Sequence, residues 1–429
     1  MSRTRPAPDL GHLAACADDL REALLDRTRG PGEVRGHARL RRRLAAARRR
    51  LPRAYRRGVL EPLLRRLDEL GPGGLRRLLE DPGEPHLAAC LLDLATAVQQ
   101  ARRRPETRAL QEVVGDLYDG FLSAEARDGV KAPPGGTLPP LVKWGRPDLG
   151  PYTWPVTWTR RLGARAGVVG FPPAAARRGL LLWAALAHET AGHDLLAAEE
   201  ELRPELGRVA GRALGRRGAG GYWADRIDEA ASDVLGILNM GPVAALAMVL
   251  HLRAVRAAAG GPARLRGQGP AREHHPAEAA RGYLGAAVVR RLRFPGAGAW
   301  AAAIEREVDR DVRVLRLGPL RFTRDGAKRM AACLARALLH TRIAALDRRT
   351  LAGIQSWSGR DERMVARLRV MLARGGRVSR RLGAGAYAAH AVAAAATAAL
   401  AGGEPARLQA RLVALLVAMN RREPRWRGA

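Results

Sequence analysis

Cysteine is scarce in this chain, and so are long apolar runs, which together exclude several classes of protein. Only three of the 429 residues are cysteines, at Cys16, Cys90 and Cys333. They are too few and too widely spaced for a disulfide framework or a cysteine metal cluster, and they fit a reducing compartment. The longest apolar run, near residues 383–402, is mostly alanine with a histidine inside it, which favours a buried helix over a membrane span. Because the N-terminus also lacks the apolar core of a secretory signal, we expect a soluble, cytoplasmic protein.

Lysine is almost absent as well. The 74 basic residues include only three lysines, Lys131, Lys143 and Lys328, so arginine carries nearly all of the positive charge. The formal net charge of +32 is typical of a protein that binds nucleic acid. However, arginine, alanine, glycine and proline are abundant together, which is typical of a GC-rich genome, and the arginines are spread along the chain. A basic, helical nucleic-acid-binding protein therefore stays open as an alternative function.

Aromatic residues make up only 4% of the chain, while alanine, leucine and arginine dominate. This composition favours helix over sheet, and we expect a mainly α protein with an α+β core. Leucines recur at helical spacing through residues 1–125. A linker is predicted at Lys131–Pro140, and the β-prone segment Leu141–Phe171 follows it. That segment holds a cluster of aromatic residues: Trp144, Tyr152, Trp154 and Trp158.

Downstream of this segment the pattern predicts mostly helices. Their expected ranges are Arg177–Asp194, Leu195–Gly215, Tyr222–Met240 and Val243–Ala259. Gly241-Pro242 is expected to end the third of these helices. From Ala277 onward the chain is again expected to be helical, with a break near Gly318-Pro319.

The segment with the clearest chemical content is the apolar helix that ends in His188, Glu189 and His193. Two imidazoles can bind a catalytic zinc ion, and a neighbouring carboxylate can take a proton from metal-bound water. The spacing is HExxxH, one residue longer than HExxH. Side chains four residues apart on an α-helix differ by about 40°, and those five apart by about 140°. One metal can therefore be shared only if a π-bulge widens the helix, which Gly192 would ease.

The helix predicted over Tyr222–Met240 offers a third metal ligand. Glu229 and Asp233 are four residues apart and so share a helix face. In such an ExxxD pattern the glutamate binds the metal, and the aspartate orients a ligating histidine. Asp228 and Asp225 make the start of this helix acidic. The alternative, a solvated acidic face, is weakened because apolar residues such as Val234 and Leu235 make the helix apolar enough to be largely buried, where a carboxylate pair without a cation would be costly.

The third motif is His275-Pro276, followed by Arg281, and it reads HPxxxxR. Proline suits the first turn of a helix, so His275 would lie at the helix start and Arg281 on its body. Arg281 could hold an oxyanion through two hydrogen bonds. His275 could donate to the same oxygen or hold Asp233 or Arg281 in place. Tyr222 and Tyr283 are alternative donors.

In this order, the three motifs resemble those of a gluzincin-type zinc metallopeptidase. The ExxxD and HPxxxxR elements resemble the membrane-associated CAAX-prenyl-protease and heat-shock-protease family, which carries HExxH. The longer HExxxH resembles that of dipeptidyl peptidase III. The resemblance covers about 187–283. The chain has neither the transmembrane helices of the first family nor the two-lobed frame of the second, so a soluble relative is expected.

The resemblance implies roles for particular residues. The implied zinc ligands are His188, His193 and Glu229. Glu189 would be the general base, Asp233 would support a ligating histidine, and His275 and Arg281 would stabilise the transition state. In metallopeptidases of this type an edge strand beside the metal helix binds an extended peptide, and Gly163–Gly170 could be that strand. The alternative is a hairpin that packs its tryptophans into the core.

We therefore predict three regions in the chain. Residues 1–130 form a helical N-terminal region, residues 131–300 form a zincin-like catalytic core with a small β region, and residues 301–429 form a helical C-terminal region packed on the core. The predicted function is zinc-dependent hydrolysis of a peptide or protein substrate. Besides nucleic-acid binding, the second alternative is a metal-binding interaction protein without catalytic activity.

Overall fold

The structure is a computed structural model that describes residues 7–28, 30, 32–122, 134–146, 150–270, 272–374 and 385–421. Helices account for 68% of the chain and strands for 8%, which confirms a mainly α fold with an α+β core. The first part of the predicted linker, 131–133, lies outside the described residues.

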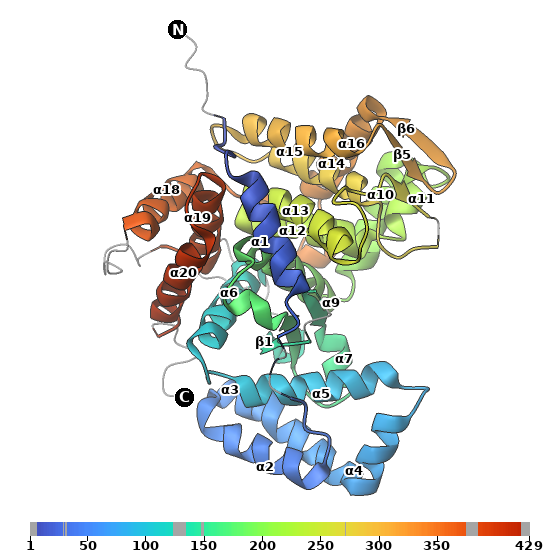
Figure 1. The fold of residues 1–429 in the computed structure, drawn as a ribbon. Helices are drawn as coiled ribbons and strands as arrows, with labels where there is room; N and C mark the ends of the chain where they lie inside the picture. The colour runs from blue at the N-terminus through green and yellow to red at the C-terminus, as the bar shows by residue number, and fades with distance from the viewer. Residues whose placement is uncertain are drawn as a thin grey trace.

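The N-terminal region forms the predicted series of helices. They are α1 (Leu13–Leu25), α2 (His37–Ala47), α3 (Arg53–Tyr55), α4 (Glu61–Glu80), α5 (Pro85–Gln100) and α6 (Pro105–Leu122), with the short helical turns η1 (Arg48–Arg50) and η2 (Arg56–Leu60). Leucines at helical spacing, such as Leu63 and Leu67 on α4, point into a hydrophobic core shared by α2, α4 and α5. Arginines such as Arg41 stay on the solvent side of the same helices. Figure 1 shows α2, α4 and α5 together at one end of the molecule.

A three-stranded sheet lies between the core shared by α2, α4 and α5 and the larger hydrophobic core of the molecule. Its strands are β1 (Leu138–Trp144), β2 (Tyr152–Trp154) and β3 (Ala166–Phe171). The order is β1-β3-β2, with β1 parallel and β2 antiparallel to β3. The prediction of a peptide-binding edge at Gly163–Gly170 is therefore wrong, because β3 is the central strand and is fully buried. A continuous apolar run is what a strand covered on both faces requires. The edge strand is β2, which leads into α7 (Val156–Arg160).

A second small sheet corrects the prediction that the chain after Ala277 contains only helices and the breaks between them. It consists of β4 (Gln268–Gly269), β5 (Val314–Leu317) and β6 (Leu320–Thr323), and β5 and β6 form a hairpin. The predicted break at Gly318-Pro319 is the two-residue turn of that hairpin, where Gly318 has φ 56°. Leu315 and Leu317 on β5 are buried, while Val314 before them and Arg316 between them are more exposed, which is the pattern of a half-buried strand.

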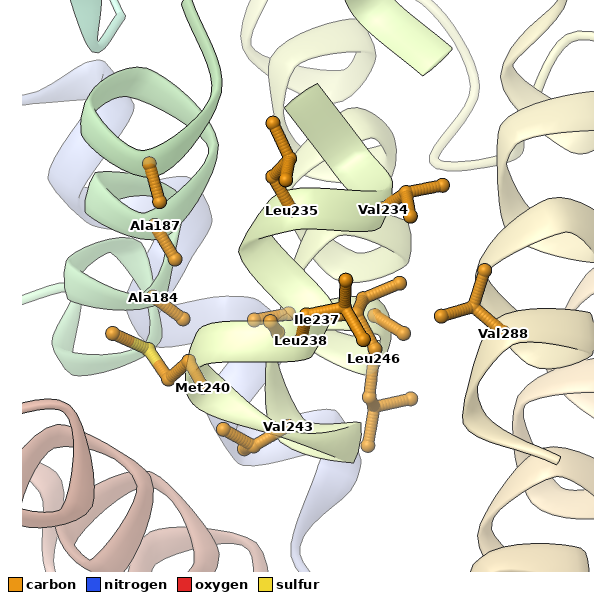
Figure 2. Packing of buried hydrophobic residues seen from close by; sticks show 14 of the residues in the cluster. Ala184, Ala187, Val234, Leu235, Ile237, Leu238, Met240, Val243, Leu246 and Val288 are labelled. Carbon is orange, nitrogen blue, oxygen red and sulfur yellow. The ribbon is translucent and has the colours of Figure 1, made fainter. Parts of the chain in front are cut away.

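The helices α12 (Ile227–Met240) and α13 (Pro242–Ala258) occupy the centre of the larger hydrophobic core. Gly241 separates them with φ 73°, so the predicted helix stop is confirmed. Figure 2 shows α12 between two neighbours, with Ala184 and Ala187 on one side and Val288 on the other. Val288 belongs to α14 (Glu278–Val289).

The C-terminal helices surround this centre. They are α15 (Ala297–Asp311), α16 (Arg324–His340), α17 (Leu351–Ile354), α18 (Gly359–Arg374), α19 (Ala388–Leu400) and α20 (Pro405–Asn420). The alanine-rich run is α19, which is mostly buried as predicted. Within the described ranges, no helix combines the length and apolar character needed to cross a bilayer. The larger core contains residues from α1, α6 and the helices from α7 to α20, whereas α2 to α5 contribute to the smaller core. The division at residues 130 and 300 stays a prediction.

Candidate metal centre

The HExxxH motif lies on one continuous helix whose winding changes along its length. It begins as a 3-10 turn, η5 (Leu180–Ala184), continues as α8 (Ala185–His188), widens into the π-helix η6 (Glu189–Asp194) and ends as α9 (Leu195–Ala198). The predicted widening is therefore confirmed at the motif itself. Because a π turn joins residues five apart, it brings His188 and His193 onto one face, where their Nε2 atoms are 3.0 Å apart.

Two glycines allow α12 to cross this helix closely. A Cβ atom at Gly192 would lie 2.5 Å from Ser232 Cα, and one at Gly236 would lie 3.2 Å from the backbone nitrogen of His188. No ordinary side chain fits the first contact without a shift of one helix. The glycine in HExxxH therefore serves the helix crossing as well as the π turn.

Replacing Gly192 by alanine is expected to destabilise the protein by about 1–3 kcal/mol, the usual cost of overpacking, and to weaken metal binding by moving α12. Gly73→Ala on α4 is the matched control, because its Cβ would meet nothing closer than Arg77 Nη1 at 3.7 Å. That control should be neutral or slightly stabilising, since alanine favours helix. Thermal unfolding and zinc titration of both variants test this, and equal behaviour of the two would contradict it.

Glu229, on α12, completes a triangle with the two histidines. Its Oε2 lies 3.5 Å from His188 Nε2, and its Oε1 lies 3.5 Å from His193 Nε2. Ligands about 2.0–2.1 Å from a tetrahedral zinc ion are about 3.3–3.4 Å from one another. The two Nε2 atoms and the nearer carboxylate oxygen of each pair are 3.0–3.5 Å apart, close to this spacing. Among the described residues, His188, His193 and Glu229 form a group that could hold a metal ion. The donor set thus fits zinc.

Each histidine also faces a carboxylate on its other ring nitrogen. Asp233 Oδ1 lies 2.9 Å from His188 Nδ1, and Asp228 Oδ2 lies 3.3 Å from His193 Nδ1. Such contacts fix the tautomer that leaves Nε2 free for a metal. Asp233 therefore has the predicted contact with a ligating histidine, His188. Asp228 makes the same kind of contact with His193, although the sequence indicated only that it adds negative charge.

Negative charge dominates the centre in spite of its burial. Burial opposes the charged form of His193, but its hydrogen bonds to Asp228 and Glu229 raise its pKa well above the ordinary value. Burial likewise opposes ionisation of Glu229, yet the nearby Arg281 and histidines lower its pKa well below the usual range. Glu229 is therefore ionised at neutral pH, and a cation would replace the proton that His193 holds.

Arg281, on α14, is fully engaged by these carboxylates. Its Nε and Nη2 donate to the two oxygens of Asp233 at 2.8 Å each, and its Nη1 lies 3.0 Å from Glu229 Oε2. The side chain is buried, with 8% of its surface exposed. This geometry favours a positioning role for Arg281 over the predicted role in holding an oxyanion.

Glu189, the predicted general base, is held by a residue that sequence analysis missed. Thr153 Oγ1, on the edge strand β2, donates to Glu189 Oε2 at 2.6 Å. Strand β2 is itself fixed by the buried Asp93, which pairs with Lys143 and accepts hydrogen bonds from Tyr152 OH at 2.7 Å and Trp154 Nε1 at 2.8 Å. The aromatic cluster in the sequence was the only sign of this support.

One cavity of about 570 Å³ brings the predicted site residues together. Seven of them line it: His188, Glu189, His193, Glu229, Asp233, His275 and Arg281. His275 lies at the mouth, 67% exposed, with Nε2 3.4 Å from Glu229 Oε1. The helix α14 starts at Glu278, two residues after Pro276 and so slightly later than predicted.

The two tyrosines proposed as alternative donors have other partners and do not line the cavity. Tyr222 OH accepts a hydrogen bond from the Ala277 backbone nitrogen at 2.8 Å. Tyr283 OH donates to Asp309 Oδ1 at 2.8 Å. This leaves His275 as the better placed donor of those considered.

Asp228→Asn is expected to weaken zinc binding by about 10–100-fold, as the loss of such supporting contacts usually does. Because Asp228 is 40% exposed, the fold should be unaffected. The matched control is Asp225→Asn, since Asp225 is exposed and does not line the cavity. Competition titrations with a zinc chelator measure both affinities. An unchanged affinity in Asp228→Asn would show that the contact with His193 has no influence.

A scan against protein-family models and searches of curated proteins and of solved structures found no match for this chain. The likeness to zinc metallopeptidases therefore depends on the three motifs and on their geometry.

Proposed function

We propose that this protein is a zinc-dependent metallopeptidase. The observation that carries the proposal is the triangle of His188, His193 and Glu229, with atoms 3.0–3.5 Å apart, beside a buried glutamate on the cavity wall. Three protein ligands with access to a cavity are typical of catalytic zinc sites, whereas structural sites use four and are closed.

Each residue of the centre would have its own role in the proposed hydrolysis. Bound zinc would supply a Lewis acid and lower the pKa of a water molecule. Glu189 would accept that proton and deliver it to the leaving amine, and the hydrogen bond from Thr153 to Oε2 keeps its carboxylate oriented. His275 would donate to the oxygen of the scissile carbonyl, while Arg281 holds Glu229 and Asp233 in place.

The substrate would be a peptide or protein segment in extended form. In the described part of the chain β2 pairs with β3 alone, so its other edge has no strand partner. Tyr152 and Thr153 of β2 also line the cavity. An extended peptide could add to this edge by backbone hydrogen bonds and present its scissile bond to Glu189.

Removing the metal is expected to abolish hydrolysis of a mixed peptide library, and adding about one equivalent of zinc per chain should restore it. The measurement is product formation by mass spectrometry before and after treatment with a chelator. Zinc binding without turnover would instead indicate the inactive metal-binding protein. Salt-sensitive binding of nucleic acid that survives His188→Ala, without hydrolysis, would support the basic nucleic-acid-binding alternative.

A further inference from the structure

One face of α13 lines the cavity along most of the helix. Ala244, Met248, His251 and Val255 follow one another at intervals of four, three and four residues, and all four line the cavity. This spacing places them in one stripe of the helix. The helix was predicted only as a buried element, but this stripe faces open space.

Opposite this stripe the walls are made mostly of small or apolar side chains. The metal helix contributes Leu181, Ala184 and Ala185, and α12 contributes Gly236 and Ile237. The charged residues of the lining are the metal-site residues, Arg266 shortly before β4, and Glu278 at the start of α14. We call the part between the α13 stripe and the helix segment 181–185 the apolar chamber. Short side chains such as Ala184 and Ala185 leave room for a bulky group there.

His251 is the polar residue of the α13 stripe, and it has no hydrogen-bond partner among the residues that the structure describes. Its Nδ1 atom is buried without a hydrogen bond. Burial, with Arg281 and His188 nearby, lowers the pKa of His251 to about 4, so the ring is neutral at pH 7. A neutral imidazole offers one donor and one acceptor. The His251 side chain itself lines the cavity. Since polar groups in the interior of folded proteins nearly always have partners, an imidazole without one in a cavity wall indicates a ligand.

We propose that the apolar chamber receives the substrate side chain next to the scissile bond, and that His251 selects a large aromatic side chain that carries a hydroxyl, as in tyrosine. The inference rests on the proposed peptidase function, because it names the substrate class of the same site. An aromatic ring suits the apolar walls, and its hydroxyl would meet the imidazole of His251. A site built to hydrogen-bond a hydroxyl discriminates against the analogue that lacks it.

The experiment uses the full-length protein with Glu189→Gln and bound zinc, so that peptides bind without being cut. Calorimetry compares three peptides that are identical except for tyrosine, phenylalanine or alanine beside the scissile bond. We expect the tyrosine peptide to bind about tenfold more tightly than the phenylalanine peptide, as one added hydrogen bond allows. His251→Phe should remove this difference, and His251→Gln should keep part of it. The matched control is His340→Phe, because His340 is exposed and does not line the cavity.

A second variant tests the chamber itself. Ala185→Leu should weaken binding of both aromatic peptides but not of the alanine peptide, because Ala185 is part-exposed and its added atoms would enter the chamber. A tyrosine-to-phenylalanine ratio unchanged by both His251 variants would overturn the inference, as would equal binding of all three peptides. If the wild-type protein cuts no peptide while the tyrosine-to-phenylalanine binding ratio still depends on His251, binding in the apolar chamber is supported and the peptidase function is contradicted. If the wild-type protein cuts peptides but the tyrosine-to-phenylalanine binding ratio does not depend on His251, the peptidase function is supported and only the proposed selection by His251 is contradicted.

Discussion

Replacing His193 by alanine is expected to remove zinc from the protein. The change deletes one of the three protein donors. Among the described residues, no other histidine, cysteine or acidic residue belongs to this group, so none is in place to replace the lost donor. The expected loss in affinity therefore exceeds the roughly 10–100-fold effect of losing a supporting contact. Metal analysis of the purified protein and a zinc titration measure it.

The control for this variant is His274→Ala. His274 is exposed and does not line the cavity, although it is adjacent in sequence to His275. Its loss should leave the zinc content at about one per chain, as in the wild type. If His193→Ala kept its full zinc content, the metal would have to lie elsewhere.

Glu189→Gln is expected to lower kcat by about 10²–10⁴-fold, the usual contribution of a general base, while zinc stays bound. Glutamine keeps the shape of the side chain but cannot accept the proton from water. The hydrogen bond from Thr153 can still be made to its carbonyl oxygen. Steady-state kinetics on a cleaved library peptide, alongside metal analysis, separates loss of chemistry from loss of the ion.

Glu201→Gln is the matched control, because Glu201 is exposed at the start of α10 (Leu202–Leu214). It should have wild-type activity. Full activity in Glu189→Gln would remove this residue from the proposed mechanism, whatever the state of the metal site.

Local spacing was enough to predict the parts of the centre that lie on single helices. The interval from His188 to His193 required a wider turn, and the π-helix is there. The interval from Glu229 to Asp233 places both on one face of α12, and both point to His188. Such predictions succeed because helical geometry alone decides them.

Contacts between distant segments could not be predicted in this way. The hydrogen bond from Thr153 to Glu189 joins a strand to a helix, and the pairing of Arg281 with Asp233 joins two helices far apart in sequence. Nothing in the residues themselves indicates which partner a guanidinium will find, so Arg281 was given a catalytic role.

In the fold as well, features set by local patterns could be predicted and features that depend on distant contacts could not. The helices of the N-terminal region and the alanine-rich α19 followed from periodicity and composition. The β5–β6 hairpin was missed because its strands are only four residues long and lie between long helices. His251 was passed over because a single histidine in an apolar helix is usually a core residue, and only the cavity distinguishes it.

The proposal depends on one cation being held jointly by two helices. His188, at the end of α8, and His193, on the π-helix η6, would bind it from one side, and Glu229 on α12 from the other. Crystals of the zinc-loaded protein, measured on both sides of the zinc absorption edge, would test it. A single anomalous peak bounded by His188 Nε2, His193 Nε2 and Glu229 is the expected result. A peak at another place, or none with zinc in excess, would contradict it.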